Sequence, residues 1–254
     1  MFSCPIIIPA RYGSTRFPGK PLHLIAGKPL VQHVWERCRQ VSLADGVIIA
    51  TDDERIARAA RDFGAEVVMT RDDHPSGTDR LAEVAALMPT ATHFLNVQGD
   101  EPLINPVLLG QLIELLRDDP VLPMVTAASA LTDEAEVDNP NTVKVVLTES
   151  GCALYFSRSR IPYARHPPEL PWYRHLGLYG YSRDFLLRFV SWPPSPLEKT
   201  ESLEQLRALE NGARVRVVAR ASISSGSMPA AAGAVAVVAR GGRGVAAGAR
   251  AGAS

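Results

Sequence analysis

Short apolar runs alternate with helix-periodic segments through the first half of the chain. A run of four or five apolar residues between turn signals predicts a buried strand, and one apolar stripe predicts a helix with one buried face. The predicted strands are 5–8, 46–50, 66–69 and 93–97; the predicted helices are 29–40, one that opens at 51–54, 79–87 and 105–117. Strands separated by helices of about 10–15 residues predict right-handed βαβ units on a parallel sheet.

The pattern changes near residue 124. Three short strand patterns follow with little helix between them, and they predict an antiparallel or mixed extension suited to dimerisation. They cover 124–130, 142–147 and 153–156, followed by a Pro-rich loop at 160–172, a helix at 202–209 and a last strand at 213–218. The predicted organisation is one α/β domain over 1–220, with an extension at about 124–182.

Residues 221–254 form a tail of different composition. No carboxylate occurs after Glu210, and from Ala230 onward the only residue types are Ala, Gly, Val, Arg and Ser. This composition has no amphipathic period, so we expect the tail to be poorly ordered.

Composition excludes several classes of protein. The 254 residues carry 27 basic and 27 acidic side chains, so no overall field favours nucleic acid or an acidic membrane surface. The three cysteines are far apart and odd in number, which argues against a disulfide framework and fits a cytoplasmic protein. No apolar stretch approaches the roughly 20 residues that span a bilayer, so we expect no membrane insertion.

The loop after the first strand concentrates cationic side chains. Arg11, Arg16 and Lys20 lie beyond a predicted parallel strand, at the end of the sheet where α/β proteins bind ligands. Cations and backbone N–H groups suit a phosphate-bearing ligand. A surface turn with solvated cations is the alternative.

This loop is not a Walker P-loop. That motif places four residues between its glycines and a Ser or Thr after its lysine. Here five residues separate Gly13 from Gly19, and Pro21 follows the lysine.

Two further loops precede helices or follow strands. Asp100 comes just after the strand at 93–97, where it would face the same crevice and hold Mg²⁺ together with phosphate oxygens. Its Gly-Asp-Glu-Pro context is equally good turn chemistry. Residues 76–80 precede a helix, so Thr78 or Asp79 is its default N-cap, and recognition of a base or sugar is the alternative.

The second half holds polar residues that are individually unspecific. A lone histidine such as His175 is more often packed or solvated than catalytic, and Glu204 on a helix face is by default solvated.

Taken together, these segments resemble the 3-deoxy-manno-octulosonate cytidylyltransferases. The resemblance covers roughly residues 5 to 218 and rests on segments that occur in the family's order: IPARYGSTRFPGKPL at 8–22, TDDERI at 51–56, HPSGTDR at 74–80, NVQGDEP at 96–102, FSRSRIPY at 156–163, RHLGLYGYSRDFL at 174–186 and LEKTESLEQLRALENG at 197–212. The first segment alone also resembles the CMP-sialic acid synthetases and other sugar nucleotidyltransferases.

The resemblance implies a Rossmann-like, three-layer nucleotidyltransferase fold, with a mainly parallel sheet and a mixed extension. It implies a homodimer that transfers CMP from CTP to 3-deoxy-D-manno-octulosonate (KDO) with Mg²⁺, releasing pyrophosphate, for lipopolysaccharide synthesis. By resemblance, the catalytic residues are Arg11, Arg16, Lys20 and the Mg²⁺ ligand Asp100. The nucleotide site adds Ala10, Ser14, Ser76, Gly77, Arg80 and Gln98, and the KDO site comprises Gln98, Arg158, His175, Tyr179, Glu204 and Gln205.

The chain departs from the family after residue 220. Members continue with a segment like Ser-Ile-Gly-Val-Asp-Thr-Pro, whose aspartate is a second Mg²⁺ ligand, whereas residues 221–229 read ASISSGSMP. Residues 225–228 can be encoded so that a one-base shift reads Ile-Gly-Val-Asp, so a frameshift near residue 220 is our hypothesis. The alternatives to the implied activity are a related sugar nucleotidyltransferase and a catalytically impaired homologue that still binds CTP.

Overall fold

The computed structural model describes residues 1–13, 17–166 and 170–220. Its strands are β1 Ile6–Ala10, β2 Leu24–Ile25, β3 Lys28–Pro29, β4 Val47–Thr51, β5 Glu66–Met69, β6 His93–Asn96, β7 Met124–Leu131, β8 Lys144–Leu147, β9 Ala153–Ser157, β10 Trp172–Ser182 and β11 Val215–Arg220. Its helices are η1 Lys20–Leu22, α1 Leu30–Cys38, α2 Glu54–Asp62, α3 Gly77–Leu87, α4 Pro106–Asp118, α5 Glu134–Asp138, α6 Arg183–Ser191, α7 Pro196–Glu201 and α8 Gln205–Glu210.

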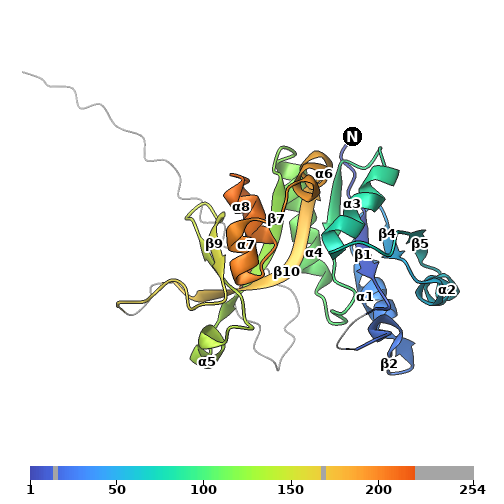
Figure 1. Ribbon diagram of the computed structural model, residues 1–254, viewed down its shortest axis with the longest axis horizontal. Coiled ribbons are helices and arrows are strands. Elements are labelled where there is room, and N and C mark those ends of the chain that lie inside the picture. The colour runs from blue at the N-terminus through green and yellow to red at the C-terminus, as the bar shows by residue number, and fades with distance from the viewer. Residues whose placement is uncertain (14–16, 167–169, 221–254) are drawn as a thin grey trace, which may run out of the picture.

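The main sheet has the order β11-β7-β10-β6-β1-β4-β5. Its parallel pairs include β1 with β4 and β6, and β4 with β5, which confirms the predicted mainly parallel α/β sheet. β10 runs antiparallel between β6 and β7. Residues 124–130 form β7, which pairs antiparallel with β10 and parallel with β11 within this sheet. Beyond it, β8 pairs with β9 and with the start of β10; Figure 1 shows β9 and α5 at the opposite end of the molecule from β4 and β5.

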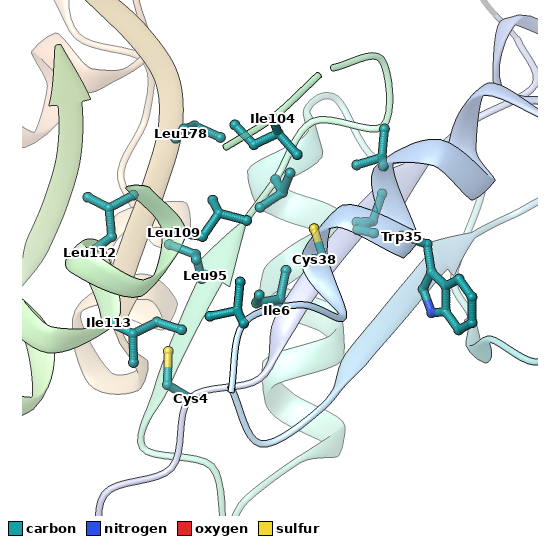
Figure 2. Close-up of a cluster of buried hydrophobic side chains, with 14 of the residues drawn as sticks. Cys4, Ile6, Trp35, Cys38, Leu95, Ile104, Leu109, Leu112, Ile113 and Leu178 are labelled. Carbon is teal, nitrogen blue, oxygen red and sulfur yellow. The ribbon is translucent and has the colours of Figure 1, made fainter. Parts of the chain in front are cut away.

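Side chains of β1 alternate between two hydrophobic cores, as the pleat of a strand requires. Ile6 and Ile8 pack in the core beneath α1 and α4, whereas Ile7 packs in the core beneath α3 and α6. Figure 2 shows Ile6 and Leu95 among side chains of α1 and α4. Helices thus cover both faces of the sheet, and the predicted three layers are confirmed.

Cys4 and Cys38 belong to the core beneath α1 (Figure 2). Burial raises the pKa of both thiols, that of Cys38 to about 12. Both residues therefore act as small packing side chains, and neither forms a disulfide.

The first strand extends further than its apolar run predicts. β1 continues through Pro9, which pairs with Ala50 of β4. The ladder between β1 and β6 ends at Ile7. Pro9 lacks the N–H that would continue the ladder toward β6, so at this residue β1 pairs with β4.

The structure also contains elements that the hydrophobic pattern did not predict: the short η1, β2, β3 and α5, and the longer β10, α6 and α7. β10 is long, but it carries Arg174, His175 and two glycines among its apolar residues, so it lacks both the continuous run and the clean alternation that indicate a strand. Its position between two other strands, rather than its composition, makes it a strand.

Gly180 of β10 packs closely against side chains of β7 and α4. A Cβ at this position would lie 2.6 Å from Val125 Cγ2 and 2.8 Å from Leu116 Cδ1. We expect Gly180→Ala to lower the free energy of unfolding by about 1–3 kcal/mol, as overpacking of a core does. Urea unfolding followed by circular dichroism measures this.

The matched control is Gly110→Ala in α4, where the new Cβ would have its nearest neighbour, Leu43 Cδ1, at 4.0 Å. Because alanine favours the helix by about 1 kcal/mol over glycine, this variant is expected to be at least as stable as the parent. Equal stability of Gly180→Ala and the parent would contradict the close packing of β10.

Candidate functional site

A cleft of about 500 Å³ opens at the carboxyl ends of β1 and β6. Three separate segments line it: the loop after β1, the start of α3 and the loop after β6. Its lining includes most residues that the sequence predicted for a nucleotide site, namely Ala10, Arg11, Lys20, Ser76, Gly77, Arg80, Gln98 and Asp100. Ser14 and Arg16 lie outside the described residues. Gln98, which was predicted for both ligands, lines this cleft.

Lys20 and Asp100 meet in this cleft although 80 residues separate them. Lys20 Nζ lies 2.5 Å from Asp100 Oδ2, and both side chains are partly exposed, at 41% and 51%. The cleft therefore presents a cation and a carboxylate side by side at its surface. Such a pair is suited to a ligand that carries both phosphate oxygens and a metal ion.

The base of the first loop is closed by local contacts. The Gly19 N–H donates to the Tyr12 carbonyl at 2.9 Å, which brings the two ends of the loop together. The Arg55 guanidinium stacks on the Tyr12 ring at 3.3 Å and is itself held by Asp53, the N-cap of α2. These contacts set the positions of Arg11 and Lys20 relative to β1.

Gly99 allows the loop after β6 to approach the end of β1. A Cβ at residue 99 would lie 3.0 Å from the Pro9 carbonyl oxygen. A side chain here would push the loop outward and take Asp100 away from Lys20. A glycine before the aspartate is thus a requirement of the close approach.

The far side of the cleft is formed by the start of α3. The predicted N-cap, Thr78 or Asp79, is wrong: Ser76 caps the helix, and its Oγ accepts from the N–H groups of both residues. Arg80 is buried, lies 3.1 Å from Asp52 and also donates to Thr70. Its guanidinium is thereby fixed at the cleft wall.

His74 lines the same cleft, and sequence reasoning did not select it. Its Nε2 contacts the Glu83 carboxylate, which also accepts from the Arg71 N–H. Its position two residues before Ser76, which was selected, could have pointed to it. A single histidine in a polar loop, however, has no pattern that separates a site residue from a solvated one.

A second cleft of about 450 Å³ lies between β10, the loop before β8 and the start of α8. It brings together four residues that the sequence predicted for the KDO site, His175, Tyr179, Glu204 and Gln205. Three lining residues that sequence reasoning missed are Asn141, Thr142 and Arg174. Arg174 supplies a cation to this lining.

Arg158, by contrast, does not line the second cleft. Its guanidinium donates to carbonyl oxygens instead, at 2.7 Å to Glu201 and 3.1 Å to Pro140. The buried Lys144 likewise donates to carbonyls, including that of Thr142 at 2.6 Å. Both cations hold the segments that wall the second cleft, and the prediction that Arg158 faces the sugar does not match this geometry.

Gln205 is the buried polar group of the second cleft. Tyr179 donates its hydroxyl to Gln205 Oε1 at 3.1 Å, and burial raises the pKa of that phenol. Gln205 Nε2 is buried and has no hydrogen-bond partner within the described part of the chain. Because a buried amide without a partner is costly, this N–H group is suited to an oxygen of a ligand.

His175 is a neutral histidine. Thr126 donates its one hydroxyl proton to the Leu178 carbonyl at 2.7 Å, so His175 Nε2, at 2.9 Å, is the donor to Thr126 Oγ1. Burial lowers the pKa of His175 to about 3. The imidazole therefore offers hydrogen bonding in the cleft, and it carries no charge at neutral pH.

This pKa predicts a dependence of stability on pH. The unfolded chain binds a proton at His175 below about pH 6.5, whereas the folded chain does so only near pH 3. Above about pH 6.5, His175 is neutral in both states and does not change the free energy of unfolding. Below that pH, protonation of the unfolded chain lowers the free energy of unfolding, and this loss grows as the pH drops toward 3. We expect a smaller fall between pH 6.5 and 5 for His175→Gln, measured by urea unfolding; equal slopes would contradict a neutral imidazole.

The two clefts share a wall. Glu204 lines the second cleft, and its carboxylate accepts from Thr78 Oγ1 at 2.6 Å and contacts Ser76 Oγ at 3.2 Å. Ser76 lines the first cleft. A ligand in one cleft therefore lies close to a ligand in the other.

The donor set is also informative about metals. No group of three or more His, Cys, Asp or Glu side chains among residues 1–13, 17–166 and 170–220 is arranged to hold a metal ion. Asp100 alone fits Mg²⁺ that arrives with a phosphate ligand, because Mg²⁺ takes one or two carboxylates and completes its shell with phosphate oxygens and water. Across the same residues, no helix is long and apolar enough to cross a membrane.

Comparisons with known proteins show the family to which the chain belongs. The cytidylyltransferase family profile matches residues 5–217. The 3-deoxy-manno-octulosonate cytidylyltransferase of Pseudomonas syringae pv. tomato is 54% identical over 84% of this chain and 87% of its own length. That of Syntrophotalea carbinolica is 50% identical over 88% and 93%.

A solved structure of CMP:2-keto-3-deoxy-manno-octonic acid synthetase, complexed with CTP, superposes with a TM-score of 0.84 at 47% identity, covering 89% of this chain and 92% of its own. A Leptospira borgpetersenii cytidylyltransferase, 15% identical with a TM-score of 0.55, shares the fold alone. On the strength of the profile and of relatives at half identity over most of the chain, the protein belongs to the 3-deoxy-manno-octulosonate cytidylyltransferase family.

Proposed function

We propose that this protein is a nucleotidyltransferase that transfers CMP from CTP to KDO, giving CMP-KDO and pyrophosphate. The relatives named for this activity support the proposal, as does the relative whose structure contains CTP. The observation that carries it is the adjacency of two clefts of different chemistry. The first pairs Lys20 with Asp100, and the second offers hydrogen-bonding groups around Gln205, as a polyhydroxylated sugar acid requires.

In this reaction the KDO hydroxyl at C2 attacks the α-phosphorus of CTP in line, while the bond to pyrophosphate breaks. Such transfers depend mainly on alignment and charge neutralisation. Arg11 and Lys20 bind triphosphate oxygens, and Lys20 stabilises the charge that develops on pyrophosphate. Mg²⁺ held by Asp100 supplies further neutralisation when bound. In the second cleft, Arg174 meets the carboxylate of the sugar.

The direct test supplies CTP and Mg²⁺ with either KDO or N-acetylneuraminate and measures pyrophosphate release. Release with KDO, and much less with N-acetylneuraminate, is the expected result. Preference for another sugar would instead favour a related sugar nucleotidyltransferase. Binding of CTP without release from either sugar would favour the impaired homologue, in which the segment at 221–229 fails to supply a second metal ligand.

We also propose that the protein acts as a homodimer in the cytoplasm, in lipopolysaccharide synthesis. The extension supports a dimer, because it exposes large apolar side chains: Leu154 is 58% exposed, Tyr163 85% and Leu170 72%. Exposed apolar groups of this kind favour an interface. The mass in solution from light scattering tests the dimer, and a monomer mass would overturn it.

A further inference from the structure

Thr78 lies at the wall between the two clefts; it is not the N-cap of α3, and the proposed mechanism gives it no role. It is buried at 3% exposure in the first turn of α3. Its hydroxyl donates to Glu204 Oε2 at 2.6 Å across 126 residues of sequence. A short hydrogen bond from a buried hydroxyl to a carboxylate is among the stronger kinds in proteins.

Counting protons shows that Thr78 is the main donor to this carboxylate. Ser76 has one hydroxyl proton, and Asp79 Oδ2 at 2.6 Å is a closer acceptor than Glu204 at 3.2 Å. Arg207 lies 3.6 Å from Glu204 and makes its short contacts to Glu198, at 2.6 and 2.8 Å. Thr78 therefore makes the one short contact to Glu204 among these three neighbours.

Burial, and to a smaller extent the nearby Asp79, raise the pKa of Glu204, and the Thr78 hydroxyl counteracts part of this rise by stabilising the ionised carboxylate. With Oε2 held by Thr78, Oε1 keeps only the longer contacts at 3.2 Å and 3.6 Å. Gln205, the next residue, presents its unpartnered Nε2 in the same cleft. Together the two side chains offer a carboxylate oxygen as acceptor and an amide group as donor to a sugar.

We propose that Thr78 is a positioning residue for the acceptor sugar, which it orients by holding Glu204 at the wall of the second cleft. The inference rests on the proposed function, since it takes KDO as the sugar. The inference assigns the start of α3 to both substrates. Ser76 and Gly77 line the cleft proposed for the nucleotide, and Thr78 holds Glu204, which lines the cleft proposed for the sugar.

The test compares Thr78→Val, which keeps the shape but removes the donor, with Thr78→Ser, which restores it. We expect Thr78→Val to raise the KM for KDO by about tenfold, as loss of a hydrogen bond to a charged group does, while the KM for CTP changes by less than about twofold. Thr78→Ser is expected to restore the KM for KDO. The control is Thr92→Val, whose hydroxyl contacts Ser3 and His93 and neither cleft.

Calorimetry provides a readout that needs no turnover. KDO is titrated into the protein loaded with a CTP analogue that has a methylene bridge between the α and β phosphorus atoms, which prevents pyrophosphate release. The inference is supported if Thr78→Val binds KDO more weakly than the parent while Thr78→Ser and Thr92→Val bind it as the parent does. Unchanged KDO binding by Thr78→Val, or an equal loss for analogue and KDO, overturns the inference and leaves the proposed function standing. Failure of the parent to bind KDO overturns both.

Discussion

Replacing Lys20 by alanine is expected to lower kcat by about 10²–10³, the usual effect of losing one preorganised group that stabilises transition-state charge. Lys20 Nζ lies beside Asp100 at the carboxyl ends of β1 and β6, where the triphosphate would lie. The charge on pyrophosphate increases as the bond to the α-phosphorus breaks, so the lysine interacts more strongly with the transition state than with bound CTP. The proposed KDO site is the other cleft, so the affinity for KDO should change little.

Steady-state kinetics with both substrates measure this split between kcat and the KM for KDO. Lys28→Ala is the matched control, because Lys28 pairs with Glu36 at 2.8 Å and lines neither cleft. We expect that control to retain the parent's kcat. An unchanged kcat in Lys20→Ala would remove Lys20 from the catalytic site.

Replacing Asp100 by asparagine is expected to have an effect of similar size for a different reason. The substitution keeps the shape and one oxygen but removes the negative charge that we propose binds Mg²⁺. We expect kcat to fall by about 10² or more, and the Mg²⁺ concentration for half-maximal rate to rise. Calorimetric titration of CTP, with and without Mg²⁺, should show that the variant loses most of the metal's contribution to CTP binding.

Asp119→Asn is the control for this experiment. Asp119 lies at the end of α4, pairs with Arg214 at 2.7 Å and is remote from the lining of both clefts. It should change neither kcat nor the dependence on Mg²⁺. If Asp100→Asn responded to Mg²⁺ as the parent does, another group would hold the metal.

Most local features of the fold could be predicted from the sequence. In α1, the five residues whose spacing predicted the buried stripe are the five that the structure buries: Leu30, Val31, Val34, Trp35 and Cys38. Asn105 caps α4 as its side chain chemistry suggests, and Gly212 has the positive φ of a residue that ends a helix. These features depend on a few neighbouring residues, so a pattern in the sequence is sufficient to reveal them.

Features that depend on distant neighbours were predicted less well. The mixed composition of β10 gave no strand signal, yet this strand joins the two halves of the sheet. Arg158 carries the charge that a sugar acid requires, but its guanidinium serves the carbonyls of Glu201 and Pro140, and Arg174 lines the cleft instead. Which of several arginines faces a ligand depends on packing that no local pattern records.

The sequence by itself determined the local elements, the cations after the first strand and the resemblance to one family. Only the tertiary structure decided that Lys20 meets Asp100, that Thr78 holds Glu204 and that two clefts share a wall. The physical reason is that periodicity and capping act within a few residues, whereas these contacts form only after β1 and β6 have paired and α8 has packed near α3. Such contacts follow from the order of strands in the sheet and from burial of its two faces, which are properties of the whole fold.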